Sequence, residues 1–237
     1  MRVLAACGMI AALLLMAACG EPEQLGERVE LESDGWVIVG DLVEPESPEP
    51  VPAVLLLHMM PTDRTSYNKL AGFLAERNIA SLRIDLRGHG ESINQGEHTQ
   101  EINAEAWRDI LAAYNFLAER ESIKPERIGI LGASYSGEQA VIAAREGADV
   151  RAFVILSSGS FSENSIQFVA NSSAHWQFIA AEDDGDVAAL MRRAADGAPG
   201  LAAATIYPRG GHGTYLFSSD RELEKKIANW FLDHLAN

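Results

Sequence analysis

The sequence predicts an α/β protein with a mostly parallel, doubly wound sheet and helices on both faces. Short, continuous apolar runs recur along the chain, as is typical of strands that are buried on both faces. Longer segments of helical periodicity separate these runs, and this alternation favours right-handed crossovers between parallel strands. The 237 residues are 47% hydrophobic and 22% charged, which suits one globular domain with its own core.

The N-terminal segment is predicted to be a signal peptide that is not part of the domain. Residues 3–18 are almost wholly apolar, but about sixteen residues fall short of the roughly 20 that span a bilayer as a helix. The run ends in Leu-Met-Ala-Ala-Cys, which resembles the bacterial lipoprotein signal, although Met16 departs from its pattern. The resemblance implies that Cys19 is diacylated and becomes the new N-terminus. The alternative is an ordinary secretory signal that leaves Cys19 as a free thiol.

These features predict a lipid-anchored protein of the bacterial cell envelope, with its domain in the periplasm or outside the cell. We expect residues 1–18 to be removed, residues 19–28 to form a tether and residues 29–237 to form the domain. Loss of Arg2 leaves a formal charge of −16, against −15 for the whole chain, so nucleic acid is a poor partner. No cysteine remains to pair with Cys19, and no disulfide is expected.

The domain is expected to open with a β-hairpin. Residues 36–43 alternate loosely, and the acidic, proline-rich residues 44–50 cannot form a central strand. Buried strands are predicted at residues 53–57, 80–86, 128–131, 152–156, 176–181 and 204–207. Helices are predicted at residues 67–77, 104–120, 137–145, 186–195 and 223–235. No G-x-G-x-x-G motif follows the first buried strand, which disfavours a dinucleotide cofactor.

A buried strand runs through a tight turn into a helix at Gly-Ala-Ser-Tyr-Ser, residues 132–136. This segment resembles the nucleophile elbow of α/β-hydrolases, G-x-S-x-G, with Ser134 as the nucleophile. Ser136 departs from the second glycine of the motif but is nearly as small. The alternative interpretation is a serine- and glycine-rich loop that only caps a helix.

A serine nucleophile needs a histidine base, and the family's chain order places an acid between the two. Three of the six histidines precede Ser134, His175 opens a predicted strand and His234 lies in the last helix. His212 remains, in a glycine-rich loop after the last predicted strand, where the family carries its base.

The acid is predicted in the loop after residues 176–181. The family's spacing selects Asp184, three residues after Ala181 and three before Val187, with Asp183 as the alternative. Its role would be to hold the tautomer of His212 and to stabilise the imidazolium. The acidic residues of this loop lack the spacing of an EF-hand, so a calcium site is disfavoured.

The oxyanion of a tetrahedral intermediate needs two hydrogen-bond donors. One would be the backbone N–H of Tyr135. The segment His-Met-Met-Pro, residues 58–61, resembles the family's H-G-x segment, so the second donor would be the N–H of Met60 or, in a shifted register, of Met59. The methionine side chains suit an apolar acyl pocket and core packing equally.

Two further features refine the family. Residues 85–92 match the D-x-R-G-x-G-x-S turn of many α/β-hydrolases, whose role is mostly structural. Residues 157–174 are too few for an inserted lid domain, so the chain resembles the minimal, dienelactone-hydrolase-like branch, although dienelactone hydrolases use cysteine where this chain has Ser134.

The resemblance implies a serine hydrolase that cleaves small-molecule carboxylic esters through an acyl-enzyme, with the triad Ser134, Asp184 and His212. It requires no metal and no organic cofactor. A peptidase or a thioesterase would use the same residues. The competing hypothesis is a non-catalytic envelope lipoprotein that keeps the fold, and the oligomeric state stays open.

Overall fold

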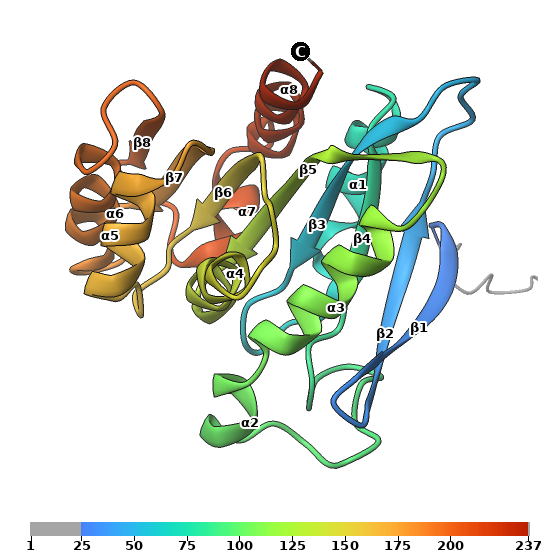
Figure 1. Cartoon of the computed structure of the whole chain (residues 1–237). Coiled ribbons are helices and arrows are strands. Elements are labelled where there is room, and N and C mark those ends of the chain that lie inside the picture. The colour runs from blue at the N-terminus through green and yellow to red at the C-terminus, as the bar shows by residue number, and fades with distance from the viewer. Residues whose placement is uncertain (1–24, 237) are drawn as a thin grey trace, which may run out of the picture.

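The computed structural model describes residues 25–236 and confirms the predicted fold class. Within that range, eight strands form one sheet in the order β1-β2-β4-β3-β5-β6-β7-β8, with helices on both faces (Figure 1). The predicted signal peptide and the lipidation site Cys19 lie outside the described residues.

The sheet is antiparallel only at its N-terminal edge. β1 pairs with β2 and β2 with β4 in antiparallel register, whereas every other neighbouring pair is parallel. The strands are β1 (Glu27–Ser33), β2 (Trp36–Val43), β3 (Val51–Leu57), β4 (Ala80–Ile84), β5 (Ile123–Ala133), β6 (Ala152–Leu156), β7 (His175–Ala181) and β8 (Ala202–Tyr207). The chain does open with a β-hairpin, but its turn lies at Asp34 and Gly35 and not in the proline-rich segment, since β2 pairs with β1 and not with β3. The strand β1 was not predicted, and it begins inside the range assigned to the tether because Glu27 already pairs with Leu42.

Helices cover both faces of the sheet. The helices are α1 (Asn68–Ala75), α2 (Gln100–Ala104), α3 (Trp107–Ala118), α4 (Tyr135–Arg145), α5 (Glu163–Asn171), α6 (Val187–Asp196), α7 (Leu216–Ser219) and α8 (Leu223–Leu235). Helices α3 to α6 pack against one face, and α1 and α8 pack against the other. Two short 3-10 turns, Arg64–Tyr67 and Gly213–Tyr215, follow β3 and precede α7.

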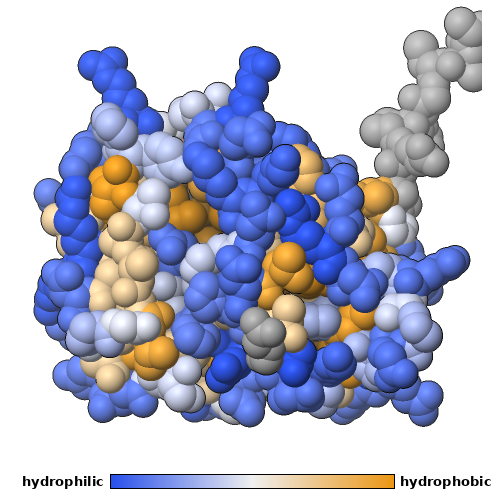
Figure 2. Space-filling view, turned by 90° about the horizontal axis from the view of Figure 1, so that it is seen from above, coloured by the Kyte–Doolittle hydropathy of each residue, from blue (hydrophilic) through white to orange (hydrophobic). Residues whose placement is uncertain are grey.

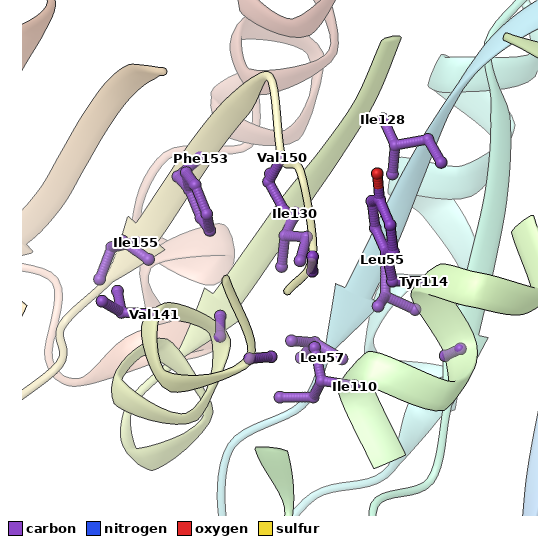
Figure 3. Close-up of a cluster of buried hydrophobic side chains, with 14 of the residues drawn as sticks. Leu55, Leu57, Ile110, Tyr114, Ile128, Ile130, Val141, Val150, Phe153 and Ile155 are labelled. Carbon is purple, nitrogen blue, oxygen red and sulfur yellow. The ribbon is translucent and has the colours of Figure 1, made fainter. Parts of the chain in front are cut away.

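The core is divided by the sheet into two layers. Leu55 and Leu57 of β3 point into the layer beneath α3 and α4, where Figure 3 shows Leu57 beside Ile110. Leu56 points to the layer beneath α1 and α8. Since successive side chains of a strand face opposite sides, a strand covered on both sides must be apolar throughout. This explains the continuous apolar runs that predicted the fold.

One predicted helix differs from the structure in its bounds, and helices α2 and α5 were not predicted. The helix predicted at residues 104–120 corresponds to α3, and the short helix α2, which ends at Ala104, precedes it and was not predicted. Helix α5 lies in the interval 157–174, for which no helix was predicted. Of its nine residues only Ser165 and Val169 are buried, so the segment contributes little to the core.

The outside of the described domain carries no large apolar surface in the view from the top of Figure 1. Figure 2 shows small apolar patches separated by hydrophilic side chains. Between residues 25 and 236, no helix combines the length and the apolar character that a membrane crossing needs. The loops that follow β3, β5, β7 and β8 meet at the other end of the sheet, since these strands are parallel.

Candidate active site

Ser134 occupies a strained turn between β5 and α4. Its backbone has φ 58° and ψ −126°, a left-handed conformation that a residue with a side chain rarely adopts. The turn is also tight, because a Cβ atom on Gly132 would lie 2.8 Å from the Cα atom of Gly137. The Ser134 N–H donates to the Leu156 carbonyl at 2.8 Å, which fixes the turn to β6. This is the geometry of a nucleophile elbow.

The structure brings Ser134, His212 and Asp184 together. The Nε2 atom of His212 lies 2.7 Å from the Ser134 hydroxyl oxygen, and Nδ1 lies 2.8 and 3.0 Å from the two carboxylate oxygens of Asp184. An ionised carboxylate only accepts hydrogen bonds, so Nδ1 carries the proton and donates it to Asp184. Nε2 is then free to accept the hydroxyl proton of Ser134, as a general base does.

Asp183 forms different hydrogen bonds from Asp184. Its Oδ1 atom accepts hydrogen bonds from the backbone N–H groups of Gly210 and Gly211, both at 3.0 Å. These glycines begin the loop that carries His212, so Asp183 anchors the loop while Asp184 contacts the imidazole itself. The sequence spacing left Asp183 and Asp184 as alternatives, and in the structure Asp184, not Asp183, hydrogen-bonds to His212.

The two methionines of the segment after β3 differ in burial and in their surroundings. Met59 is fully buried, and a Cβ atom on Gly213 would meet its sulfur at 2.5 Å, so its side chain packs beneath the His212 loop. Met60 is 38% exposed and lines a cleft beside the elbow. Tyr135 is the first residue of α4, and the N–H groups of a first turn have no acceptor within their own helix.

His58 braces this segment and does not act as a base. Its Nε2 atom accepts from the Leu86 N–H at 3.1 Å, so Nδ1 carries the proton and donates to the Met59 carbonyl at 3.0 Å. Complete burial lowers the pKa of His58 from the ordinary range, which keeps the ring neutral. The N–H and hydroxyl of Thr62 donate to the same carbonyl, both at 2.9 Å.

Ser136, the departure from the family motif, is fully buried and joins the two strands beside the elbow. Its hydroxyl oxygen accepts from the Ala133 N–H at 2.9 Å and lies 3.0 Å from the Leu57 carbonyl and 2.9 Å from the Ala133 carbonyl. Leu57 ends β3, directly before the segment that holds Met59 and Met60. A glycine at this position would have no hydroxyl to make these contacts.

The D-x-R-G-x-G-x-S turn is structural, as the sequence predicted. The Asp85 carboxylate accepts from the Arg64 side chain at 2.5 Å and from the N–H groups of Arg64 and Glu91 at 2.8 and 2.9 Å. Arg87 forms a buried pair with Asp109, with a shortest contact of 2.7 Å. These bonds tie the turn after β4 to the segment after β3 and to α3.

A cleft of about 500 Å³ opens beside Tyr135, the residue that follows Ser134. Its walls come from the segment after β3, from α2 and the loop before it, from the first turns of α4 and from the loop after β6. The lining residues are Met60, His98, Gln100, Asn103, Ala104, Tyr135, Glu138, Gln139 and Ser160.

Sequence analysis identified Met60 and Tyr135 in this cleft but missed the other lining residues. Glu138 was missed because nothing in its sequence context distinguishes it from any other polar residue on a helix. The residues of α2 carried no signal, because none of that helix's side chains is buried.

Comparisons with known sequences identify related proteins. Residues 48–198 match the family described as "Serine aminopeptidase, S33". The uncharacterized protein YfhR of Salmonella typhi is 31% identical over 111 residues, which are 46% of this chain and 35% of YfhR. The 2,6-dihydropseudooxynicotine hydrolase of Paenarthrobacter nicotinovorans is 28% identical over 137 residues, which are 58% of this chain and 36% of that protein. The chain thus spans about a third of the length of the curated relatives it matches.

Solved structures share the fold over nearly the whole described domain. Est1E from Butyrivibrio proteoclasticus with bound ferulic acid has a TM-score of 0.74 and 16% identity, covering 88% of this chain and 100% of that chain. Dienelactone hydrolase from Anabaena variabilis has a TM-score of 0.70 and 21% identity, covering 88% of this chain and 97% of that chain.

Proposed function

Because this chain belongs to the serine aminopeptidase S33 family, we propose that it is a serine hydrolase that cleaves carboxylic esters of small molecules through an acyl-enzyme. One observation carries the proposal. The Ser134 hydroxyl, the His212 imidazole and the Asp184 carboxylate form a continuous hydrogen-bonded series at 2.7 and 2.8 Å, on a strained turn that presents the serine.

In the proposed reaction, Ser134 Oγ attacks the ester carbonyl carbon while His212 Nε2 accepts the hydroxyl proton. Asp184 stabilises the resulting imidazolium through the Nδ1 proton. The N–H of Tyr135 and that of Met60, or of Met59 in the shifted register, donate to the oxyanion. The alcohol leaves with the proton from His212. A water molecule then attacks the acyl group by the same route and releases the acid.

Two features support an ester as the substrate. The interval 157–174 holds only the short helix α5, so the cleft has no inserted lid domain over it. The solved structures with this fold include Est1E and a dienelactone hydrolase. The triad as such serves esters, peptides and thioesters alike, so the leaving group must be tested directly.

The test compares three substrates that share one acyl group. Butyryl p-nitrophenyl ester, butyryl p-nitroanilide and a butyryl thioester are offered to the wild-type protein and to Ser134→Ala. We expect kcat/KM to be highest for the ester and to fall at least a thousandfold in Ser134→Ala. A highest value for the anilide or for the thioester would instead support a peptidase or a thioesterase. Equal rates with and without Ser134 would support the non-catalytic hypothesis.

We also propose that Cys19 anchors the mature protein to a bacterial membrane through lipid, on the strength of the signal sequence alone. Globomycin, which blocks lipoprotein signal peptidase, should cause the precursor to accumulate. Mass spectrometry of the mature protein should find a diacylated N-terminal Cys19. An unmodified N-terminus, or cleavage that globomycin does not affect, would contradict lipidation.

A further inference from the structure

Resting on the proposed function, we infer that the cleft selects esters that carry an organic cation, and that Glu138 is the residue that recognises it. The inference concerns the substrate class, which neither the triad nor the family match determines. It starts from one carboxylate in the wall of the cleft.

Glu138 is a charged side chain held in a nearly buried position. Only 9% of it is exposed, and it lines the cleft beside Met60 and Tyr135. Its carboxylate accepts from the Ser162 N–H at 3.0 Å and from the Ser162 hydroxyl at 2.7 Å. Over residues 25–236, no lysine, arginine or histidine forms an ion pair with it. The hydrogen bonds from Ser162 therefore fix the position of the carboxylate, and no positively charged side chain of the described residues pairs with it.

The two bonds from Ser162 do not exhaust the carboxylate. Its two oxygens offer about four acceptor sites, so positions remain for a group in the cleft. A buried charge without an opposite charge is costly, and a cationic ligand would remove that cost. The bonds from Ser162 also hold the side chain in one orientation before any ligand arrives, which reduces the entropy that binding must overcome.

The rest of the cleft favours an organic cation over a strongly hydrated one. The ring of Tyr135, the thioether of Met60 and the methyl of Ala104 line it together with Glu138. Aromatic faces and soft apolar groups around an anion are typical surroundings for a quaternary ammonium group. His98 and Tyr135 are the other ionisable residues of the wall, and Glu138 is its one carboxylate. The formal charge of −15 on the whole chain also attracts cations.

The position of Glu138 sets the spacing within the substrate. It lies three residues after Tyr135, the first residue of α4, which corresponds to a rise of about 4.5 Å along the helix. Test substrates therefore carry the cation about three methylene groups from the ester carbonyl, so that the two groups can lie about one helical turn apart.

The test uses pairs of esters that differ only in charge. The first pair is the p-nitrophenyl esters of 4-(trimethylammonio)butanoate and of its neutral isostere 5,5-dimethylhexanoate. The second pair places the charge on the alcohol, as acetylcholine, the acetic ester of choline, against 3,3-dimethylbutyl acetate. The readout is the ratio of kcat/KM for the cationic ester to that for the neutral one, which cancels general losses of activity or folding.

We expect the ratio for at least one pair to fall about tenfold or more in Glu138→Gln, equivalent to about 1.4 kcal/mol. Glu138→Asp keeps the charge and should retain more of the preference. Glu146→Gln removes the same charge from the exposed end of the same helix and should leave the ratio as in wild type. A role limited to holding Ser162 would alter stability but not this ratio.

Two failures are distinguishable. If the neutral esters are hydrolysed and the ratio for both pairs is the same in wild type and Glu138→Gln, the inference about the cation is wrong and the hydrolase proposal stands. If the wild-type protein hydrolyses none of the four esters, the hydrolase proposal fails and this inference falls with it.

Discussion

The adjacent acids Asp183 and Asp184 allow the proposed triad to be tested with two nearly identical substitutions. In Asp184→Asn, the amide nitrogen can face His212 Nδ1, which would then have to accept a hydrogen bond. The proton would move to Nε2, and that atom could no longer take the proton of Ser134. In a serine protease the same tautomer error lowers kcat by about 10⁴, equivalent to about 5.5 kcal/mol in the barrier. We expect a loss of similar size here.

Asp183→Asn provides the matched control. Both backbone N–H groups of the His212 loop donate to one oxygen of Asp183, and an amide oxygen can accept both. Only the contribution of the negative charge is lost, worth about 1 kcal/mol, so kcat should fall by tenfold or less. The assay is steady-state hydrolysis of a p-nitrophenyl ester, with thermal unfolding of both variants. A larger loss of kcat in Asp183→Asn than in Asp184→Asn would refute this assignment of the two acids.

Two further predictions concern the buried polar groups around the site. Ser136→Gly restores the family motif but leaves the Ala133 N–H without the hydroxyl as its acceptor. The free energy of unfolding should therefore fall by about 1–3 kcal/mol, and kcat should fall more than KM changes. An unchanged unfolding midpoint and an unchanged kcat would contradict this prediction. Burial lowers the pKa of His89 from 6.5 to about 4. The unfolded chain therefore binds more protons in that interval, and stability should fall as the pH drops from about 6.5 to 4. Thermal unfolding of wild type and His89→Gln across these pH values should show a shallower dependence in the variant, and parallel curves would be contrary evidence.

The sequence predicted those parts of the fold whose burial leaves a pattern. The bounds of β6 and α8 coincide with the predicted ranges 152–156 and 223–235, because one is an unbroken apolar run and the other an amphipathic helix. Helices α2 and α5 bury few or no side chains and contribute little to the core, and neither was predicted.

The same holds for the candidate site, where some residues leave a recognisable pattern in the sequence and others do not. Ser134 and His212 were identifiable because a tight turn and an open loop demand small neighbours, and glycine supplies them. The choice between Asp183 and Asp184 depends on the direction of each side chain, which spacing alone does not determine. Glu138 resembles any polar residue on a helix, and its position in the cleft depends on α2 and on the loop after β6, which are distant in sequence.

The central claim is that Ser134 is a nucleophile activated by His212, and covalent labelling tests it most directly. A fluorophosphonate probe reacts with an activated serine and scarcely with an ordinary one, and peptide mass spectrometry locates the adduct. We predict one phosphonylated residue, Ser134, with no labelling of Ser134→Ala and strongly slowed labelling of His212→Gln. A folded wild-type protein that takes up no probe, or that carries it at another residue, would contradict the account.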